Sequence, residues 1–96
     1  MKIDFEKIEK ELKVNLDGRL DTTTSPDFET FLANNLNGID TLTIDCEKLV
    51  YVSSAGLRVL LSTQKKMKNS MKLVNVCELV MEVFEMTGFA DILVIE

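Results

Sequence analysis

The 96-residue sequence contains no histidine. Its absence excludes Ser-His-Asp and Cys-His nucleophilic sites and histidine-ligated zinc, and it removes the commonest general base near neutral pH. Cysteine is scarce as well. Cys46 and Cys77 are far apart and lack any paired-ligand spacing, so we interpret both as small buried hydrophobic residues. The sequence therefore predicts neither catalytic residues nor a metal site.

Long apolar runs and an excess of positive charge are also missing. No segment approaches the roughly 20 apolar residues of a membrane-spanning helix. Residues 1–6 carry charges where a signal peptide needs an apolar stretch. The formal net charge of −5 disfavours a nucleic-acid binder or an anionic membrane surface as partner, because both need clustered Lys and Arg. We expect a cytoplasmic protein with no direct nucleic-acid or membrane partner.

What is present fits one folded domain over residues 1–96. Apolar residues make up 46% of the chain and charged residues 28%, which suits a packed core with a solvated surface. One proline and four glycines leave no stretch that resembles a linker. A chain of this length has no room for a second independent core.

Predicted strands alternate with predicted helices. Residues 12–20 alternate apolar and polar side chains, as a half-buried strand does, and residues 3–9 are interpreted as its hairpin partner although they also fit a helical spacing. The other predicted strands are residues 41–46, 49–52, 71–76 and 92–95, with a short connection at Glu47-Lys48. The predicted helices are residues 25–36, 53–69 and 78–86. This order predicts an α/β fold, with helices packed against a mixed, mostly parallel sheet that has an antiparallel edge.

A threonine-rich segment follows the strand at residues 12–20. It begins with Asp21 and predicts a helix start, in which either Thr24 or Ser25 serves as the N-cap and Pro26 lies in the first turn. Asp21 and the three threonines after it have two interpretations at this point. They are ordinary turn and capping residues, or they border a surface that binds a partner.

A pair of serines begins the second predicted helix. A helix start leaves free backbone N–H groups that serine caps well and that also bind phosphate. Gly56 costs about 1 kcal/mol relative to alanine inside a helix, so it needs a reason. A partner or a phosphate approaching the backbone is one reason, and packing against the sheet is the other. From the residues alone, Ser53 or Ser54 as an ordinary N-cap is the preferred interpretation.

Two motifs change that preference. They are Val14-Asn15-Leu16-Asp17-Gly18-Arg19-Leu20-Asp21 and Val52-Ser53-Ser54-Ala55-Gly56-Leu57-Arg58-Val59-Leu60. The first resembles a strand and turn of the STAS domain, the fold of bacterial anti-sigma factor antagonists. The second resembles that family's Asp-Ser-Ser/Thr-Gly-Leu phosphorylation turn. With the spacing, the element order and the closing Met86-Thr87-Gly88-Phe89, the resemblance covers essentially the whole chain.

The resemblance implies a binding protein that is switched by phosphorylation, and not an enzyme. The family's phosphorylated serine falls on Ser54. Ser53 occupies the place where the family often has aspartate, and it is the alternative acceptor. The resemblance implies two partners. One is an anti-sigma factor that is also a serine kinase, and the other is a serine phosphatase; together they would regulate sigma-factor-dependent transcription by partner switching. No cofactor is implied. The expected partner-binding residues are Asp21, Thr22, Thr23, Ser53, Ala55, Gly56 and Arg58.

Other functions stay open at this point. An unphosphorylated STAS interaction module in a signalling or transport assembly would use the same residues. A nucleotide-binding or hydrolytic protein has the least support, because the sequence has no Walker-type loop and no Gly-x-Ser-x-Gly elbow. Arg58 also has a plainer interpretation, as a solvated side chain one turn after Ser54.

Overall fold

The computed structural model describes residues 1–68 and 70–96. Its strands form one four-stranded sheet in the order β1-β2-β3-β4. These strands are β1 (Lys2–Ile8), β2 (Glu11–Leu20), β3 (Thr41–Val52) and β4 (Met71–Val74). β1 is antiparallel to β2, whereas β2, β3 and β4 run parallel. The predicted hairpin and the mixed, mostly parallel sheet are both confirmed.

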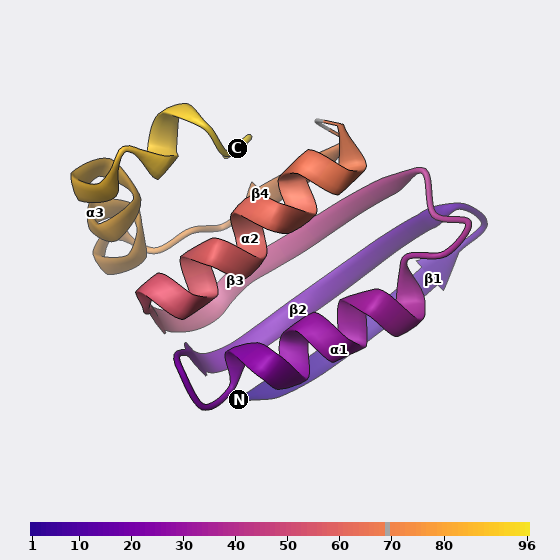
Figure 1. The fold of residues 1–96 in the computed structure, drawn as a ribbon, viewed down its shortest axis with the longest axis horizontal. Helices are drawn as coiled ribbons and strands as arrows, with labels where there is room; N and C mark the ends of the chain where they lie inside the picture. Colours follow the sequence, from indigo (N-terminus) through magenta and orange to yellow (C-terminus); the bar gives the residue numbers. More distant parts are fainter. Residues whose placement is uncertain (69) are drawn as a thin grey trace.

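Helices α1 (Ser25–Asn35) and α2 (Ser54–Met67) connect the parallel strands and lie across one face of the sheet (Figure 1). Helix α3 (Glu78–Thr87) lies at the end of the molecule where α2 begins, and a short 3-10 helix, η1 (Phe89–Asp91), follows it. The start of α2 therefore lies at the carboxyl ends of β2 and β3, the edge at which α/β sheets commonly carry their binding sites.

Alternating side chains divide the central strand between core and solvent. The buried side chains of β2 are Leu12, Val14, Leu16 and Leu20. Lys13, Asn15, Asp17 and Arg19 are exposed on the opposite face of the strand. The fully buried aromatic rings Phe28 of α1 and Phe84 of α3 pack in the same hydrophobic cluster as these leucines. The helix-covered face of the sheet is thus the core, and the other face is polar.

Strand β3 differs from its prediction. Residues 41–46 and 49–52 belong to a single strand, and the short connection predicted at Glu47-Lys48 is wrong. The pairing of β3 with β2 shifts register twice, between Asn15 and Asp17 and again between Gly18 and Arg19. Such bulges let a strand continue through residues that break its alternation. The two adjacent charged residues in β3 therefore resembled a turn in the sequence, although they lie within a bulged strand.

The C-terminal segment also differs from its prediction. The strand expected at residues 92–95 is wrong, because this segment makes only one parallel bridge, between Leu73 and Ile95. The N–H of Leu73 donates to the carbonyl of Val94, and the N–H of Glu96 donates to the carbonyl of Leu73, each at 2.9 Å. The predicted end of the second helix at Asn69 lies outside the described residues.

Both cysteines are free thiols. Cys46 is buried in β3, and burial raises the pKa of its thiol to about 12. Cys77 is half-buried before α3, and its thiol donates to the carbonyl of Leu49 at 3.5 Å. Over residues 1–68 and 70–96, none of the helices combines the length and the apolar character needed to cross a bilayer.

Helix α3 provides a test of core packing. Replacing Phe84, which is 0% exposed, by alanine leaves a large cavity, so Phe84→Ala is expected to lower the free energy of unfolding by about 3–5 kcal/mol. Urea denaturation followed by circular dichroism measures this change. Met86→Ala on the same helix is the control, because Met86 is 87% exposed and its truncation is expected to change stability by no more than about 0.5 kcal/mol. Equal losses in the two variants would contradict this packing.

Candidate functional site

A single residue separates β3 from α2, and that residue caps the helix. Ser53 has an extended backbone, with φ −91° and ψ 175°, and its Oγ accepts a hydrogen bond from the N–H of Gly56 at 3.4 Å. This is the usual geometry of an N-cap, in which a side-chain oxygen satisfies one of the free donors of the first turn. Of the two serines predicted as possible N-caps, Ser53 is confirmed as the cap.

Ser54 is the first residue of α2, and its side chain is exposed. Throughout the described part of the chain, its hydroxyl takes part in none of the side-chain hydrogen bonds that fix the neighbouring turns. The two serines thus have different environments. Ser53 Oγ serves the helix, while Ser54 Oγ faces solvent beside the free N–H groups of the helix start.

Gly56 is buried against the end of β2. A Cβ atom added at Gly56 would lie 2.8 Å from Leu20 Cγ and 2.8 Å from the Leu20 carbonyl oxygen, closer than real Cβ contacts. Packing against the sheet is therefore sufficient reason for a glycine in the first turn of α2. Gly56 is buried, so its role in the site is to allow the start of α2 to pack closely against β2. The exposed surface of the site comes from the residues beside it.

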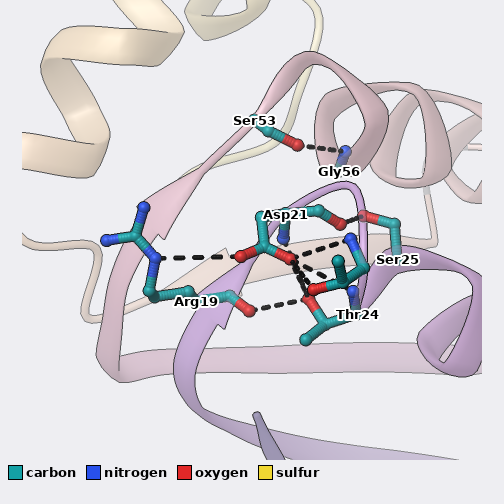
Figure 2. Close-up of polar contacts among 7 residues, drawn as sticks. Arg19, Asp21, Thr24, Ser25, Ser53 and Gly56 are labelled. Atoms are coloured by element: carbon teal, nitrogen blue, oxygen red, sulfur yellow. Dashed lines mark hydrogen bonds and ion pairs between the residues drawn. The ribbon is translucent and has the colours of Figure 1, made fainter.

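A backbone hydrogen bond joins the two turns of the site. The N–H of Ser53 donates to the carbonyl of Leu20 at 2.9 Å. Asp21 follows Leu20 directly, so the turn after β2 and the turn after β3 lie next to each other, as Figure 2 shows. Parallel neighbouring strands end at the same edge of a sheet, which explains why two segments so far apart in sequence meet here.

The Asp21 carboxylate organises the turn after β2. Its Oδ1 accepts from the N–H of Thr23 at 3.0 Å, the hydroxyl of Thr23 at 2.8 Å and the N–H of Thr24 at 3.1 Å (Figure 2). These hydrogen bonds, led by the one from the Thr23 hydroxyl, hold the pKa of Asp21 below its ordinary value of 3.8. Asp21 is therefore an ionised turn-capping residue.

The same turn begins α1. Thr24 is the N-cap residue by position, which confirms one of the two predicted caps, but its side chain makes no cap bond. Its hydroxyl instead donates to the carbonyl of Arg19 at 2.7 Å and accepts from the N–H of Asp21 at 2.9 Å. Thr24 thus closes the turn on itself and keeps the Asp21 carboxylate in place.

Arg19 and Tyr51 also support the site, although the sequence did not predict either residue. Both lie on the polar face of the sheet, opposite the helices. Arg19 Nε lies 3.8 Å from Asp21 Oδ2, and the guanidinium carbon lies 4.2 Å from the centre of the Tyr51 ring. Arg19 and Tyr51 are register partners across β2 and β3. Only the strand pairing brings them together, and the bulge in β3 hides that pairing in the sequence. Their contact adds a cation–π link between the two strand ends.

The structure brings most of the predicted site residues to one edge. Thr22 and Thr23 are exposed in the first turn, and Ala55 is half-buried in the second. Arg58 is exposed one helical turn after Ser54, on the outer surface of α2. The site is therefore a largely exposed, polar surface built by two short turns, which suits contact with another protein more than enclosure of a small molecule.

Comparison with known proteins gives the family. The STAS domain family matches residues 2–96. The chain is a STAS domain protein. It is 35% identical over 96 residues to the putative anti-sigma factor antagonist BtrV of Bordetella bronchiseptica, covering 96% of this chain and 83% of that one. It is 30% identical over 94 residues to the anti-sigma-B factor antagonist of Bacillus subtilis, covering 95% of this chain and 86% of that one.

A solved structure gives the same fold. It is that of the Bacillus cell fate determinant SpoIIAA in its phosphorylated form, with a TM-score of 0.74, 16% identity, and coverage of 99% of this chain and 91% of that one. At this identity the likeness shows the fold alone. The STAS fold and the anti-sigma factor antagonist family expected from the two sequence motifs are both confirmed.

The contact between Gly56 and Leu20 can be tested by adding one methyl group. Gly56→Ala is expected to lower the free energy of unfolding by about 1–3 kcal/mol through overpacking, although alanine favours a helix by about 1 kcal/mol. Chemical denaturation measures the change. Ser62→Ala is the control, because Ser62 is exposed on the same helix and already carries a Cβ, so the change adds no atom. An increase in stability for Gly56→Ala would show that the two segments do not meet this closely.

The Asp21 turn predicts a pH dependence. Because the pKa of Asp21 is lowered in the folded state, the stability from its ionised form is present above pH 3.8 and is lost as the pH falls through the lower folded value. Wild type is therefore expected to melt at a higher temperature than Asp21→Asn at neutral pH, and the difference is expected to shrink in acid. Thermal unfolding from pH 7 downward measures it, with Asp40→Asn as the control outside the turn. A difference that does not change with pH would contradict this role.

Proposed function

We propose that this STAS protein is an anti-sigma factor antagonist that is switched by phosphorylation of Ser54. In the unmodified state it binds an anti-sigma factor that is also a serine kinase, and so frees the sigma factor. The observation that carries the proposal is the exposed Ser54 hydroxyl, next to a Ser53 that is already used as the helix cap. The names of the curated relatives, both called anti-sigma factor antagonists, support the identity of the partner.

The geometry favours Ser54 over Ser53 as the acceptor. Modification of Ser53 would withdraw the hydroxyl that accepts from the N–H of Gly56, and it would place a phosphate close to the contact with Leu20. Modification of Ser54 disturbs no hydrogen bond among those that define the two turns. A kinase can therefore reach and modify Ser54 without unfolding the helix start.

In the proposed reaction this chain is the substrate. The Ser54 Oγ attacks the γ-phosphorus of magnesium-bound ATP, the bond to the β–γ bridging oxygen breaks, ADP leaves, and the hydroxyl proton passes to a base of the kinase. A serine phosphatase later hydrolyses the phosphoester and restores the hydroxyl. The fold supplies an exposed, rigidly placed hydroxyl, and the partner enzymes supply the catalytic groups.

A phosphate at Ser54 has opposite effects on folding and on binding. It adds a charge of about −1.5 to −2, which the free N–H groups and the dipole of α2 accommodate. In a desolvated contact with a partner, an unpaired charge costs about 3–5 kcal/mol. That cost weakens binding by about two to three and a half orders of magnitude. The modification therefore releases the partner while the protein stays folded.

The test is labelling by the cognate anti-sigma factor kinase with radioactive ATP. Wild type is expected to incorporate one phosphate per chain, and Ser54→Ala is expected to incorporate none. Ser53→Ala is the matched control and is expected to be labelled, with a helix start weakened by about 1 kcal/mol through loss of the cap. Labelling of Ser54→Ala at the wild-type rate would overturn the assignment of Ser54.

Binding to the same kinase tests the switch itself. Ser54→Glu is expected to weaken the complex by at least about tenfold in isothermal titration, and Ser54→Ala is expected to keep it. A protein that binds the anti-sigma factor but is never labelled would instead be an unphosphorylated STAS interaction module. This second outcome is worth testing because the chain has Ser53 where the family often has an aspartate.

A further inference from the structure

One side of α3 presents apolar side chains to solvent. Leu79 is 62% exposed, and Met86, at 87%, is the most exposed large apolar side chain of the described residues. Half-buried Val83 lies between them. Their spacing of i, i+4 and i+7 aligns the three side chains along the helix. We call Leu79, Val83 and Met86 the α3 stripe.

The core uses the α3 stripe only through Val83, which is half-buried and packs against it. Val80 and Phe84, both 0% exposed, already anchor α3 to the rest of the molecule. Scattered single apolar residues on a surface are ordinary, but a stripe of three on one helix is typical of a surface that another helix covers. The side chains of Leu79 and Met86, with the exposed part of Val83 between them, are therefore available to a partner.

Charge decides what kind of partner fits the α3 stripe. All three charged residues of α3, which are Glu78, Glu82 and Glu85, are acidic and exposed, and none of its ten residues is Lys or Arg. A second copy of this chain would bring six like charges together across the same contact, which is unfavourable. An anionic lipid surface would also be repelled. The complementary occupant is an amphipathic helix whose apolar residues are flanked by Lys or Arg.

The position of α3 relates the stripe to the proposed switch. Helix α3 lies at the end of the molecule where α2 begins, the same end as the turn of Ser53 and Ser54 (Figure 1). The N-cap residue of α3, Cys77, contacts the Leu49 carbonyl of β3, three residues before that strand ends. One protein of ordinary size bound over the serine turn therefore lies within reach of α3.

We propose that the α3 stripe and its three glutamates form a second docking surface, which binds a basic amphipathic helix of the protein that contacts the serine turn. The identity of that protein rests on the proposed function, whereas the surface chemistry rests on α3 alone. The contact combines burial of Leu79, Val83 and Met86 with ion pairs to the glutamates.

The surface can be tested with a model peptide. The probe is a helical peptide of about 18 residues, in which leucines at i, i+4 and i+7 spacing are flanked by lysines, titrated into the isotopically labelled protein. Amide resonances of residues 78–87 are expected to shift most. The same peptide with glutamate in place of lysine is expected to leave these resonances unchanged. Shifts that centre elsewhere on the molecule, or no shifts, would overturn the proposal.

Two variants of α3 distinguish a docking surface from general attraction to an acidic protein. Leu79→Gln combined with Met86→Gln is expected to weaken peptide binding by at least about tenfold. Ile8→Gln, at a 57% exposed apolar residue of β1, is the control and is expected to leave it within about twofold. The triple variant Glu78→Gln, Glu82→Gln, Glu85→Gln is expected to bind weakly and to lose its salt dependence. Wild-type affinity in either α3 variant would overturn the proposal.

The peptide titration and the Ser54 labelling fail independently. If the peptide binds α3 but no kinase labels Ser54, the docking surface stands and the phosphorylation switch is wrong. If Ser54 is labelled but the peptide does not bind α3, the switch stands and the docking surface is wrong. Circular dichroism on each variant is expected to show unchanged helix content, since all the substituted side chains are exposed.

Discussion

The meeting of Leu20 with the start of α2 is the constraint on which the site depends. The Leu20 carbonyl accepts from the N–H of Ser53 at 2.9 Å, and the Leu20 side chain fills the space that a Cβ at Gly56 would occupy. Asp21 begins its turn one residue later, so this single contact sets the distance between both turns. The packing at this point thus requires a glycine at position 56. As a result, two loops separated by some thirty residues of sequence form one surface.

On the proposed function, the two adjacent serines separate a structural role from a regulatory one. A hydroxyl that caps a helix contributes about 1 kcal/mol to its stability, and the Ser53 oxygen already has this structural use. Ser53 is the cap, so Ser54 is left exposed at the position where the helix dipole best tolerates negative charge. On the proposed function, modification at Ser54 can change what the surface binds while the fold beneath it keeps its hydrogen bonds.

The local pattern of apolar and polar residues was enough to predict most of this fold, but it predicted less of the site. Alternation along β2 and the apolar spacing of the helices follow from one-sided burial, so the sequence displays them directly. The bulges in β3 break the alternation, and the lone bridge at Ile95 depends on β4, so both escaped prediction. In the site, motifs located Asp21 and Ser54. The contacts of Arg19 with Tyr51 and of Gly56 with Leu20 depend on strand register and helix docking, which no local pattern encodes.

On the two proposals together, a second docking surface at the same end of the molecule changes how a phosphate at Ser54 acts. When two contacts bind the same partner, the second forms within the complex, and the joint affinity exceeds that of either contact alone. A phosphate at Ser54 then has to abolish only the contact at the serine turn, because the α3 stripe alone holds a partner weakly. The negative charges of the two surfaces act differently. The glutamates of α3 attract a basic partner helix permanently, whereas the phosphate lies at the turn that must be desolvated on binding. The proposed switch is therefore a loss of close contact, which long-range attraction cannot replace at physiological ionic strength.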